Sequence, residues 1–357
     1  MNVMPAPSLP LGWRISVALV LALATGCGDG RPAPPPPPRL PPADPKVAAQ
    51  AQANARLDQL HAAEGMPGVQ AAVLAGGAVV WQAARGTTLA GAVVTPTTRF
   101  PLASVSKLAT ALMLARLVAD RRVDLEAAVS TYVPGWRDDG APITVRQLAG
   151  HLAGIRHYNL TDVGRTKSYD RLADAAADIF ASDPRVGSPG ERYAYSSWGY
   201  SLLGAVLEGA SGSSYRELLD RELAQPTGIV LATDPGASSR WPSGGLQGSA
   251  VDLVRLGSLG LPGTPYLPPE VVATMLTPQQ TRAGASTGVG LGWRVGADAA
   301  GRRIAHHAGN LPDARAVVVV YLDLGVVVAL MSNRGNSPAE VERVAGELAA
   351  PFLPAPR

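Results

Sequence analysis

The sequence predicts an α/β fold of the α+β kind, in which both ends of the folded chain build one antiparallel sheet around a helical insertion. Two strand patterns lie before residue 85, and three more occur only after residue 302. The residues between them show short helical patterns and turns. With 46% hydrophobic and 17% charged residues, the chain of 357 residues is not disordered as a whole.

The first residues predict a leader. Arg14, the short apolar run 15–25 and the small residues after it are typical of a secretory signal peptide. The sequence Leu23-Ala-Thr-Gly-Cys27 resembles a bacterial lipobox, in which the cysteine is lipidated and becomes the first residue. The alternative is an ordinary signal peptide with a chance cysteine. We expect residues 1–26 to be removed and Cys27 to anchor a lipoprotein to a membrane of the cell envelope, facing the periplasm or the cell exterior.

Proline dominates the next segment. Nine of the fifteen residues from 31 to 45 are proline, a composition that holds the chain extended as polyproline II. We interpret residues 27–46 as a lipid-anchored spacer before a folded domain at residues 47–357. A ligand for SH3-type domains is the alternative interpretation.

The folded part opens with a helix and a hairpin. Residues 47–64 have helical spacing, and the apolar segments 69–74 and 78–84 read as two strands joined at Gly76-Gly77. Residues 102–118 predict a helix with almost no polar face, which should be buried on all sides.

The middle of the chain, at about residues 103–240, is expected to be the all-helical insertion, since turn clusters divide it into short segments. The chain then ends with three strand patterns and a helix, at residues 303–307, 314–321, 325–331 and 339–350. We expect these strands to join the N-terminal hairpin, with the two terminal helices flanking the sheet.

The sharpest chemical signal is Ser104-Val-Ser-Lys107 at the start of the predicted buried helix. Positions i and i+3 of a helix lie on one face, so the lysine amine reaches the serine hydroxyl. A serine is a weak nucleophile until a base takes its proton. Burial lowers the pKa of a lysine toward the neutral form that acts as a base. Ser104 and Lys107 are therefore a candidate nucleophile and base; a helix cap at Ser104 is the alternative.

A second group is Tyr193-Ala-Tyr195-Ser-Ser197, just ahead of a helical pattern. The Tyr195 phenol would shuttle a proton if a nearby ammonium depressed its pKa from about 10. The alternative is a core tyrosine, with Ser197 capping the helix.

A third group is His307-Ala-Gly309-Asn310 on a predicted strand. Gly309 is expected to leave space for a substrate backbone. The Asn310 amide is a candidate oxyanion donor beside the amide of Ser104. Alternation along a strand directs His306 to the face opposite His307.

In this order, the motifs resemble the serine β-lactamase and penicillin-binding-protein superfamily, in its class C-like branch of β-lactamase-related serine hydrolases. The segment His151-Leu-Ala-Gly-Ile-Arg-His-Tyr158 is similar to the family of mitochondrial serine β-lactamase-like proteins and their bacterial relatives. The resemblance covers nearly all of residues 65–335. The superfamily's Ser-x-x-Lys, Tyr-x-Asn and Lys-Thr-Gly or His-x-Gly motifs correspond here to Ser104 with Lys107, Tyr195 with Ser197, and His307 with Gly309.

The resemblance implies a β-lactamase/transpeptidase-like fold and a serine hydrolase that forms an acyl-enzyme. Two positions depart from the pattern, because Ser197 stands where many relatives have asparagine and His307 where many have lysine. A neutral imidazole binds the carboxylate of a β-lactam or a D-Ala terminus less strongly than an ammonium. Esters or peptides are therefore favoured, and D-Ala-type and β-lactam amides stay open. The alternative is a catalytically weak or silent binding or scaffold protein.

A rival serine lies in Gly284-Ala-Ser286-Thr-Gly288, which matches the nucleophile elbow of α/β-hydrolases. That elbow needs a strand before it and a helix after it. Here a loop precedes the motif and a strand pattern at 289–293 follows it, so we do not favour Ser286.

The composition excludes several other classes of function. The net charge is only +3 and no long basic run occurs, so nucleic acid is not an expected partner. With a single cysteine and no suitable spacing of histidines and acids, no metal site and no cofactor are expected. The expected partners are a small-molecule or peptide acyl substrate and, through the lipid, a membrane.

Overall fold

The computed structural model describes residues 44–63, 65–138, 141–159, 162, 167–335 and 340–354. The predicted signal peptide, Cys27 and the spacer up to residue 43 lie outside the described residues. Within the described ranges, no helix is both long and apolar enough to cross a bilayer.

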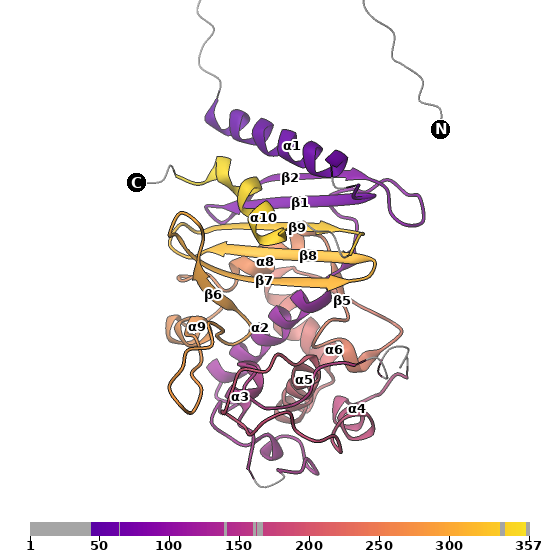
Figure 1. Cartoon of the computed structure of the whole chain (residues 1–357), viewed down its shortest axis with the longest axis vertical. Helices are drawn as coiled ribbons and strands as arrows, with labels where there is room; N and C mark the ends of the chain where they lie inside the picture. Colours follow the sequence, from indigo (N-terminus) through magenta and orange to yellow (C-terminus); the bar gives the residue numbers. More distant parts are fainter. Residues whose placement is uncertain are drawn as a thin grey trace, which may run out of the picture. The chain divides into compact units, whose positions relative to one another are not determined.

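The main sheet has six strands in the order β2-β1-β9-β8-β7-β6, and every neighbouring pair is antiparallel. Two strands come from the N-terminal part and four from the C-terminal part, as predicted for a sheet built from both ends. Figure 1 shows them stacked across the molecule, indigo strands beside yellow ones. The strands are β1 (Gly68–Ala75), β2 (Ala78–Gly86), β6 (Arg294–Ala297), β7 (Arg303–Leu311), β8 (Ala314–Tyr321) and β9 (Val326–Ser332).

Strand β6 differs from the sequence prediction. Residues 289–293 were expected to form a strand, yet among them only Val289 makes a single bridge, to Arg294, where β6 begins. Glycines at 290 and 292 explain this difference, because each lies too close to other atoms for a side chain. A Cβ at Gly290 would be 2.0 Å from the Met275 carbonyl oxygen. The tight loop at residues 290–293 therefore leads directly into β6, a short strand at the edge of the sheet.

Helices cover both faces of the sheet. Helix α1 (Pro45–Ala63) and helix α10 (Val341–Ala349) pack on one face, and α8 (Ala250–Ser258) packs on the other (Figure 1). Helix α1 begins two residues inside the segment interpreted as spacer. Proline suits the first helical position, and the Asp44 carboxylate accepts a hydrogen bond from the Lys46 amide at 2.9 Å.

The insertion between β2 and β6 is mostly helical. Most of it lies below β7 in Figure 1, whereas its helix α8 packs on the inner face of the sheet. It also contains a small antiparallel sheet in the order β3-β5-β4, so the expected helical stretch 103–240 includes the short strand β4. Its elements are β3 (Phe100–Pro101), η1 (Ala103–Val105), α2 (Ser106–Ala119), η2 (Val129–Thr131), α3 (Val145–Ala149), α4 (Leu172–Ile179), α5 (Ser197–Ser211), α6 (Tyr215–Leu218), η4 (Leu219–Ala224), α7 (Gln225–Thr227), β4 (Ala232–Thr233), η5 (Ser238–Arg240), β5 (Leu246–Gly248), α8 and α9 (Pro269–Leu276); η6 (Ala350–Phe352) follows α10.

Two apolar clusters form the core, one on each face of the sheet. The outer cluster joins the sheet to α1 and α10 through residues such as Leu57, Val328 and Leu348. The inner cluster joins it to α2, α5 and α8. As predicted, α2 is buried nearly all round, with every residue from 106 to 115 buried. This central helix carries the Ser-x-x-Lys motif.

Candidate active site

Ser104 lies on a tight turn directly before α2. Ala103 has a φ of 47°, a left-handed conformation that is uncommon for a residue with a side chain. The turn is tied to β5, since the Leu102 amide donates to the Leu246 carbonyl at 2.8 Å and the Leu246 amide donates to Ser106 Oγ at 3.1 Å. These bonds hold Ser104 half-buried at the entrance of the helix.

The Lys107 amine lies 3.3 Å from Ser104 Oγ, as the motif spacing predicted. It also lies 3.0 Å from Ser197 Oγ and 2.6 Å from the Ser243 carbonyl oxygen. Lys107 is fully buried, and desolvation holds its pKa well below the ordinary value. A neutral amine has two N–H donors and one lone pair. It can donate to Ser243 and Ser197 and accept the proton of Ser104, which is the arrangement a base requires.

Ser104 and Ser197 are not helix caps. Helix α2 has Val105 at its N-cap and no side-chain cap, so the hydroxyl of Ser104 is turned to Lys107 instead. Helix α5 is capped by Ser196, whose Oγ accepts from the Gly199 amide at 2.8 Å. That cap places Ser197 at the first helical position, with its hydroxyl on Lys107.

Tyr195 completes the group. Its ring centroid is 4.9 Å from the Lys107 amine, and its hydroxyl interacts with the side chains of Ser104 and Ser197. The condition under which Tyr195 would act through a depressed pKa is not met: burial raises the pKa of Tyr195, and these hydrogen bonds only oppose the rise. Tyr195 is therefore a protonated phenol at neutral pH.

Two histidines that the sequence motifs did not assign hold the Tyr195 turn in place. Nδ1 of His151 accepts the Ser196 amide at 3.2 Å, and Nδ1 of His157 accepts the Ser197 amide at 3.1 Å. The rings of His151 and Tyr195 are 4.5 Å apart. Burial is the main cause that lowers the pKa of both histidines, so both stay neutral. The only sequence signal for them was the segment from His151 to Tyr158, noted for its family resemblance.

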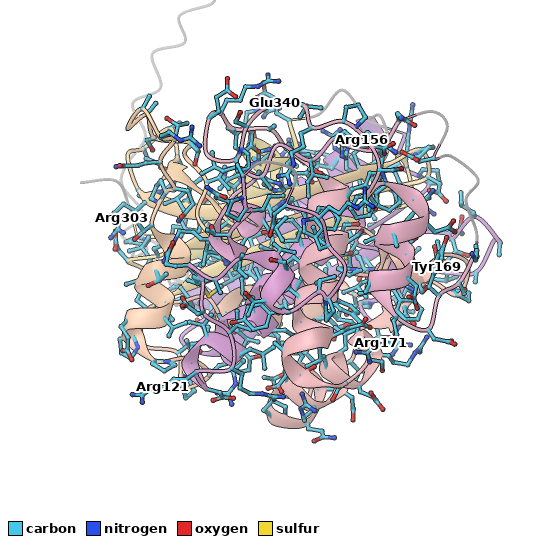
Figure 2. All side chains as sticks on the ribbon, turned by 90° about the horizontal axis from the view of Figure 1, so that it is seen from below. Arg121, Arg156, Tyr169, Arg171, Arg303 and Glu340 are labelled. Carbon is cyan, nitrogen blue, oxygen red and sulfur yellow. The ribbon has the colours of Figure 1, made fainter. Side chains whose placement is uncertain are left out.

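The same loop is anchored by a buried ion pair. Arg156 donates to Asp162 at 2.6 Å and to Asp183 at 2.6 Å, and Asp162 is almost fully buried. Asp162 also accepts from the Trp198 indole at 3.2 Å. Figure 2 shows Arg156 on the helical side of the molecule. The pair therefore fixes the loop to the first turn of α5.

His307 faces the site from β7. It lies on the inner face with Ala305, whereas Ile304 lies on the outer face, so alternation separates His307 from His306 as predicted. Burial is the main cause that lowers the pKa of His307 to about 3. The Ala308 carbonyl, 2.8 Å from Nδ1, can only accept, so the neutral ring carries its proton there and presents Nε2 as an acceptor.

The space at Gly309 is filled by the protein itself, which corrects the expectation that it leaves room for a substrate backbone. A Cβ at Gly309 would lie 2.5 Å from the Leu102 carbonyl oxygen and 2.7 Å from the Ser104 nitrogen. Glycine is needed because the nucleophile turn packs directly on the strand.

The Asn310 amide points toward the cleft edge of β7. The Leu322 amide donates to the Arg303 carbonyl, so residue 303 bonds toward β8. Antiparallel pairing alternates the bonding edge at each residue, and the β7–β8 register has no break. Residue 310 therefore bonds toward the opposite edge, where β6 no longer pairs beyond His306. The Asn310 amide thus lies at the open edge of β7, one residue after Gly309, on which the Ser104 turn packs.

The rival Ser286 does not form an elbow. It lies exposed in a loop, bridges Gln280, and is followed by more loop and β6 rather than a helix. Nor do the described residues contain a cluster of histidine, cysteine and acidic side chains that could hold a metal ion. Cys27 lies outside the described residues.

A serine with a buried lysine base beneath an antiparallel sheet defines a Ser-x-x-Lys serine hydrolase. The family model described as Beta-lactamase matches residues 53–350. The protein belongs to this Beta-lactamase family, and so to the superfamily of serine β-lactamases and penicillin-binding proteins.

Individual relatives agree with this assignment. Penicillin-binding protein 4 of Amycolatopsis lactamdurans is 28% identical over 354 residues, covering 84% of this chain and 90% of that protein. Protein flp of Staphylococcus aureus (strain COL) is 30% identical over 135 residues, or 37% of this chain. The match covers 27% of flp, so it spans about a quarter of that relative. The crystal structure of SurE with D-Leu superposes with a TM-score of 0.74 at 29% identity, covering 86% of this chain and 76% of that one.

Proposed function

We propose that this protein hydrolyses an ester or peptide through an acyl-enzyme on Ser104, in the cell envelope. The observation that carries the proposal is the 3.3 Å contact between the Ser104 hydroxyl and the fully buried Lys107, whose pKa is held well below its ordinary value by desolvation. Among the residues that the structure describes, no acidic side chain pairs with Lys107, and a catalytically silent scaffold has no need to bury an unpaired lysine at a cost in free energy.

The first step is acylation. As Ser104 Oγ attacks the substrate carbonyl carbon, its proton passes to the lone pair of Lys107, and the new C–O bond turns the carbonyl oxygen into an oxyanion. The amides of Ser104 and Asn310 stabilise that charge. Protonated Tyr195 donates to the leaving group, and Lys107 returns the proton to the phenol. The leaving group departs as the C–N or C–O bond breaks.

The second step reverses these roles. Water attacks the carbonyl carbon of the acyl-serine, and Lys107 takes the water's proton by way of the Tyr195 hydroxyl. The bond between that carbon and Ser104 Oγ then breaks as Lys107 returns the proton to Ser104, and the acid product leaves. His307 presents an acceptor nitrogen and thereby orients a substrate N–H or O–H. No cofactor takes part in this scheme.

A labelled fluorophosphonate tests the nucleophile, because it forms a stable bond only with an activated serine. The full chain is compared with Ser104→Ala and with Ser286→Ala as the matched control. We expect labelling to be lost only in Ser104→Ala, after which esters, D-Ala peptides and β-lactams are compared as substrates. Labelling lost only in Ser286→Ala would overturn the assignment, and no labelling of any form would favour the scaffold alternative.

The envelope location rests on Leu23-Ala-Thr-Gly-Cys27 and the proline-rich spacer. Metabolic labelling with a radioactive fatty acid in a bacterial host tests it. We expect the label in the wild-type chain and none in Cys27→Ser. Equal labelling of both would disprove the lipid anchor without affecting the hydrolase proposal.

A further inference from the structure

The carbonyl of Ser243 decides where the lone pair of Lys107 points. The Lys107 amine lies 2.6 Å from this oxygen, closer than it lies to the hydroxyls of Ser197 and Ser104. A neutral amine turns about its Cε–Nζ bond, and its lone pair takes the direction that its two N–H groups leave free. With those groups on Ser243 and Ser197, the lone pair faces Ser104 Oγ. A displaced Ser243 carbonyl would therefore turn the base away from the nucleophile.

This carbonyl belongs to an irregular segment between η5 and β5. Turn bonds close the segment on itself, since the amides of residues 243–245 all donate to the Arg240 carbonyl at 2.8–3.0 Å. These bonds fix the shape of the segment but not its distance from α2. That distance depends on side chains of the helices packed against it.

Thr110 provides such a side chain, one turn after Lys107 on α2. Its Oγ1 donates to the Pro242 carbonyl at 2.7 Å, so α2 binds two successive carbonyls of the segment through side chains three residues apart. The two carbonyls belong to adjacent, planar peptide groups, so fixing one of them restricts the other. Thr110 therefore helps to fix the carbonyl that Lys107 uses.

Packing alone does not explain the hydroxyl of Thr110. Residues 106–115 of α2 are all buried, and a buried hydroxyl is costly unless it is hydrogen-bonded. Thr110 Oγ1 also lies 2.7 Å from the hydroxyl of the buried Tyr215. The Pro242 carbonyl can only accept, so Tyr215 donates to Thr110 and Thr110 donates to Pro242. The threonine proton is therefore directed at the segment.

We propose that Thr110 is a positioning residue: its bond to Pro242 fixes the Ser243 carbonyl and thereby aims the lone pair of Lys107 at Ser104. The inference rests on the proposed function. Because Thr110 acts through the segment on the base, it affects the chemical step and leaves the binding of a reagent in the cleft unchanged.

The test measures the reaction of Ser104 with a labelled fluorophosphonate in the full chain, as kinact and KI. Thr110→Val keeps the shape of the side chain and removes the hydroxyl. We expect kinact to fall about 10- to 100-fold with KI unchanged, because a misdirected base slows the attack. Thr110→Ser retains the hydroxyl and should keep kinact within about threefold of the wild type. Thr110→Ala gives the same readout as Thr110→Val if the valine variant does not fold.

Tyr266→Phe is the matched control. It also removes a buried bond from a hydroxyl to a carbonyl, since Tyr266 donates to Glu222 at 2.6 Å. Tyr266 lies beside Arg116, in the last turn of α2 and so at the end opposite the site. The control should keep the wild-type kinact at a comparable loss of thermal stability.

The outcomes separate the two proposals. A wild-type kinact in Thr110→Val, or a change in KI alone, would overturn the role of Thr110 and leave the hydrolase intact. Thr110→Ser as slow as Thr110→Val, or an equal loss of kinact in Tyr266→Phe, would also overturn it, because packing or stability would then explain the effect. A wild-type chain that is not labelled at Ser104 would overturn the proposed function, and with it this inference.

Discussion

The two faces of the main sheet bury different chemistry. The outer cluster, under α1 and α10, is apolar and includes Val328, Val344 and Leu348. The inner side also buries Lys107, His151 and His307, whose pKa values are all lowered by desolvation. One sheet therefore stabilises the fold on one face and holds uncharged bases on the other. Removing a base should improve stability at the expense of activity, whereas trimming an apolar side chain on the outer face should lower stability and leave activity unchanged.

The largest effect is expected from Lys107→Met. Without the base, kcat/KM should fall by about 10³-fold or more. Stability should rise by about 1–3 kcal/mol, because the folded-state pKa of Lys107 lies below its unfolded value. At neutral pH the unfolded chain then binds a proton that the folded chain does not bind. This proton stabilises the unfolded state, and the effect grows as pH falls. Urea unfolding at pH 7 and pH 9 checks this: a less stable variant, or a gain that is larger at pH 9, would contradict it.

Core truncations compare the two faces directly. Leu348→Ala on the outer face should lower the free energy of unfolding by about 2–5 kcal/mol and leave kcat unchanged. Leu112→Ala, the same change on α2 in the inner cluster, should cost a similar amount and also lower kcat, since α2 positions Lys107. Equal kcat values for both variants would show that the site does not depend on inner packing.

The pH dependence of stability tests whether His307 is buried in its neutral form. Its pKa is about 3 when folded and about 6.5 when unfolded, so the unfolded chain binds the extra proton between these values. The folded protein therefore becomes less stable as pH falls below about 6.5, and His307 accounts for about 2 kcal/mol of the stability lost between pH 7 and pH 5. In His307→Gln this part of the loss should be absent. Urea unfolding at both pH values measures this loss. If the wild type and His307→Gln lost the same stability between pH 7 and pH 5, the burial of a neutral His307 would be disproved.

The smallest effect is expected at the α5 cap. Ser196→Ala removes the hydroxyl that accepts from the Gly199 amide and donates to the Arg156 carbonyl, and should cost about 1 kcal/mol. Because Ser197 and Tyr195 flank this cap, kcat/KM should fall several-fold as well. Ser214→Ala, at the capping box of α6, is the control for a cap away from the site. If both variants lose activity equally, the cap has no particular role in catalysis.

Local patterns predicted the parts of the site that lie close together in sequence. Ser104 and Lys107 are only three residues apart, at the turn before α2 and in its first turn, and the alternation of residues predicted the strand that contains His307. The sequence did not predict the partners supplied by tertiary packing, such as the Ser243 carbonyl on Lys107 or the His157 nitrogen on the Ser197 amide. Nor did it predict that burial raises the pKa of Tyr195, because that burial depends on the packed insertion.

The sheet topology also has a consequence for biosynthesis. Val69 of β1 pairs with Ser332 of β9, and the Ser104 turn rests on Gly309 of β7. During synthesis Ser104 therefore emerges from the ribosome early, whereas β7, the strand on which its turn packs, emerges much later. Such distant pairings form slowly. An unfinished chain that lacks β7 would contain Ser104 without the strand on which its turn packs, so the site assembles only after β7 has been made.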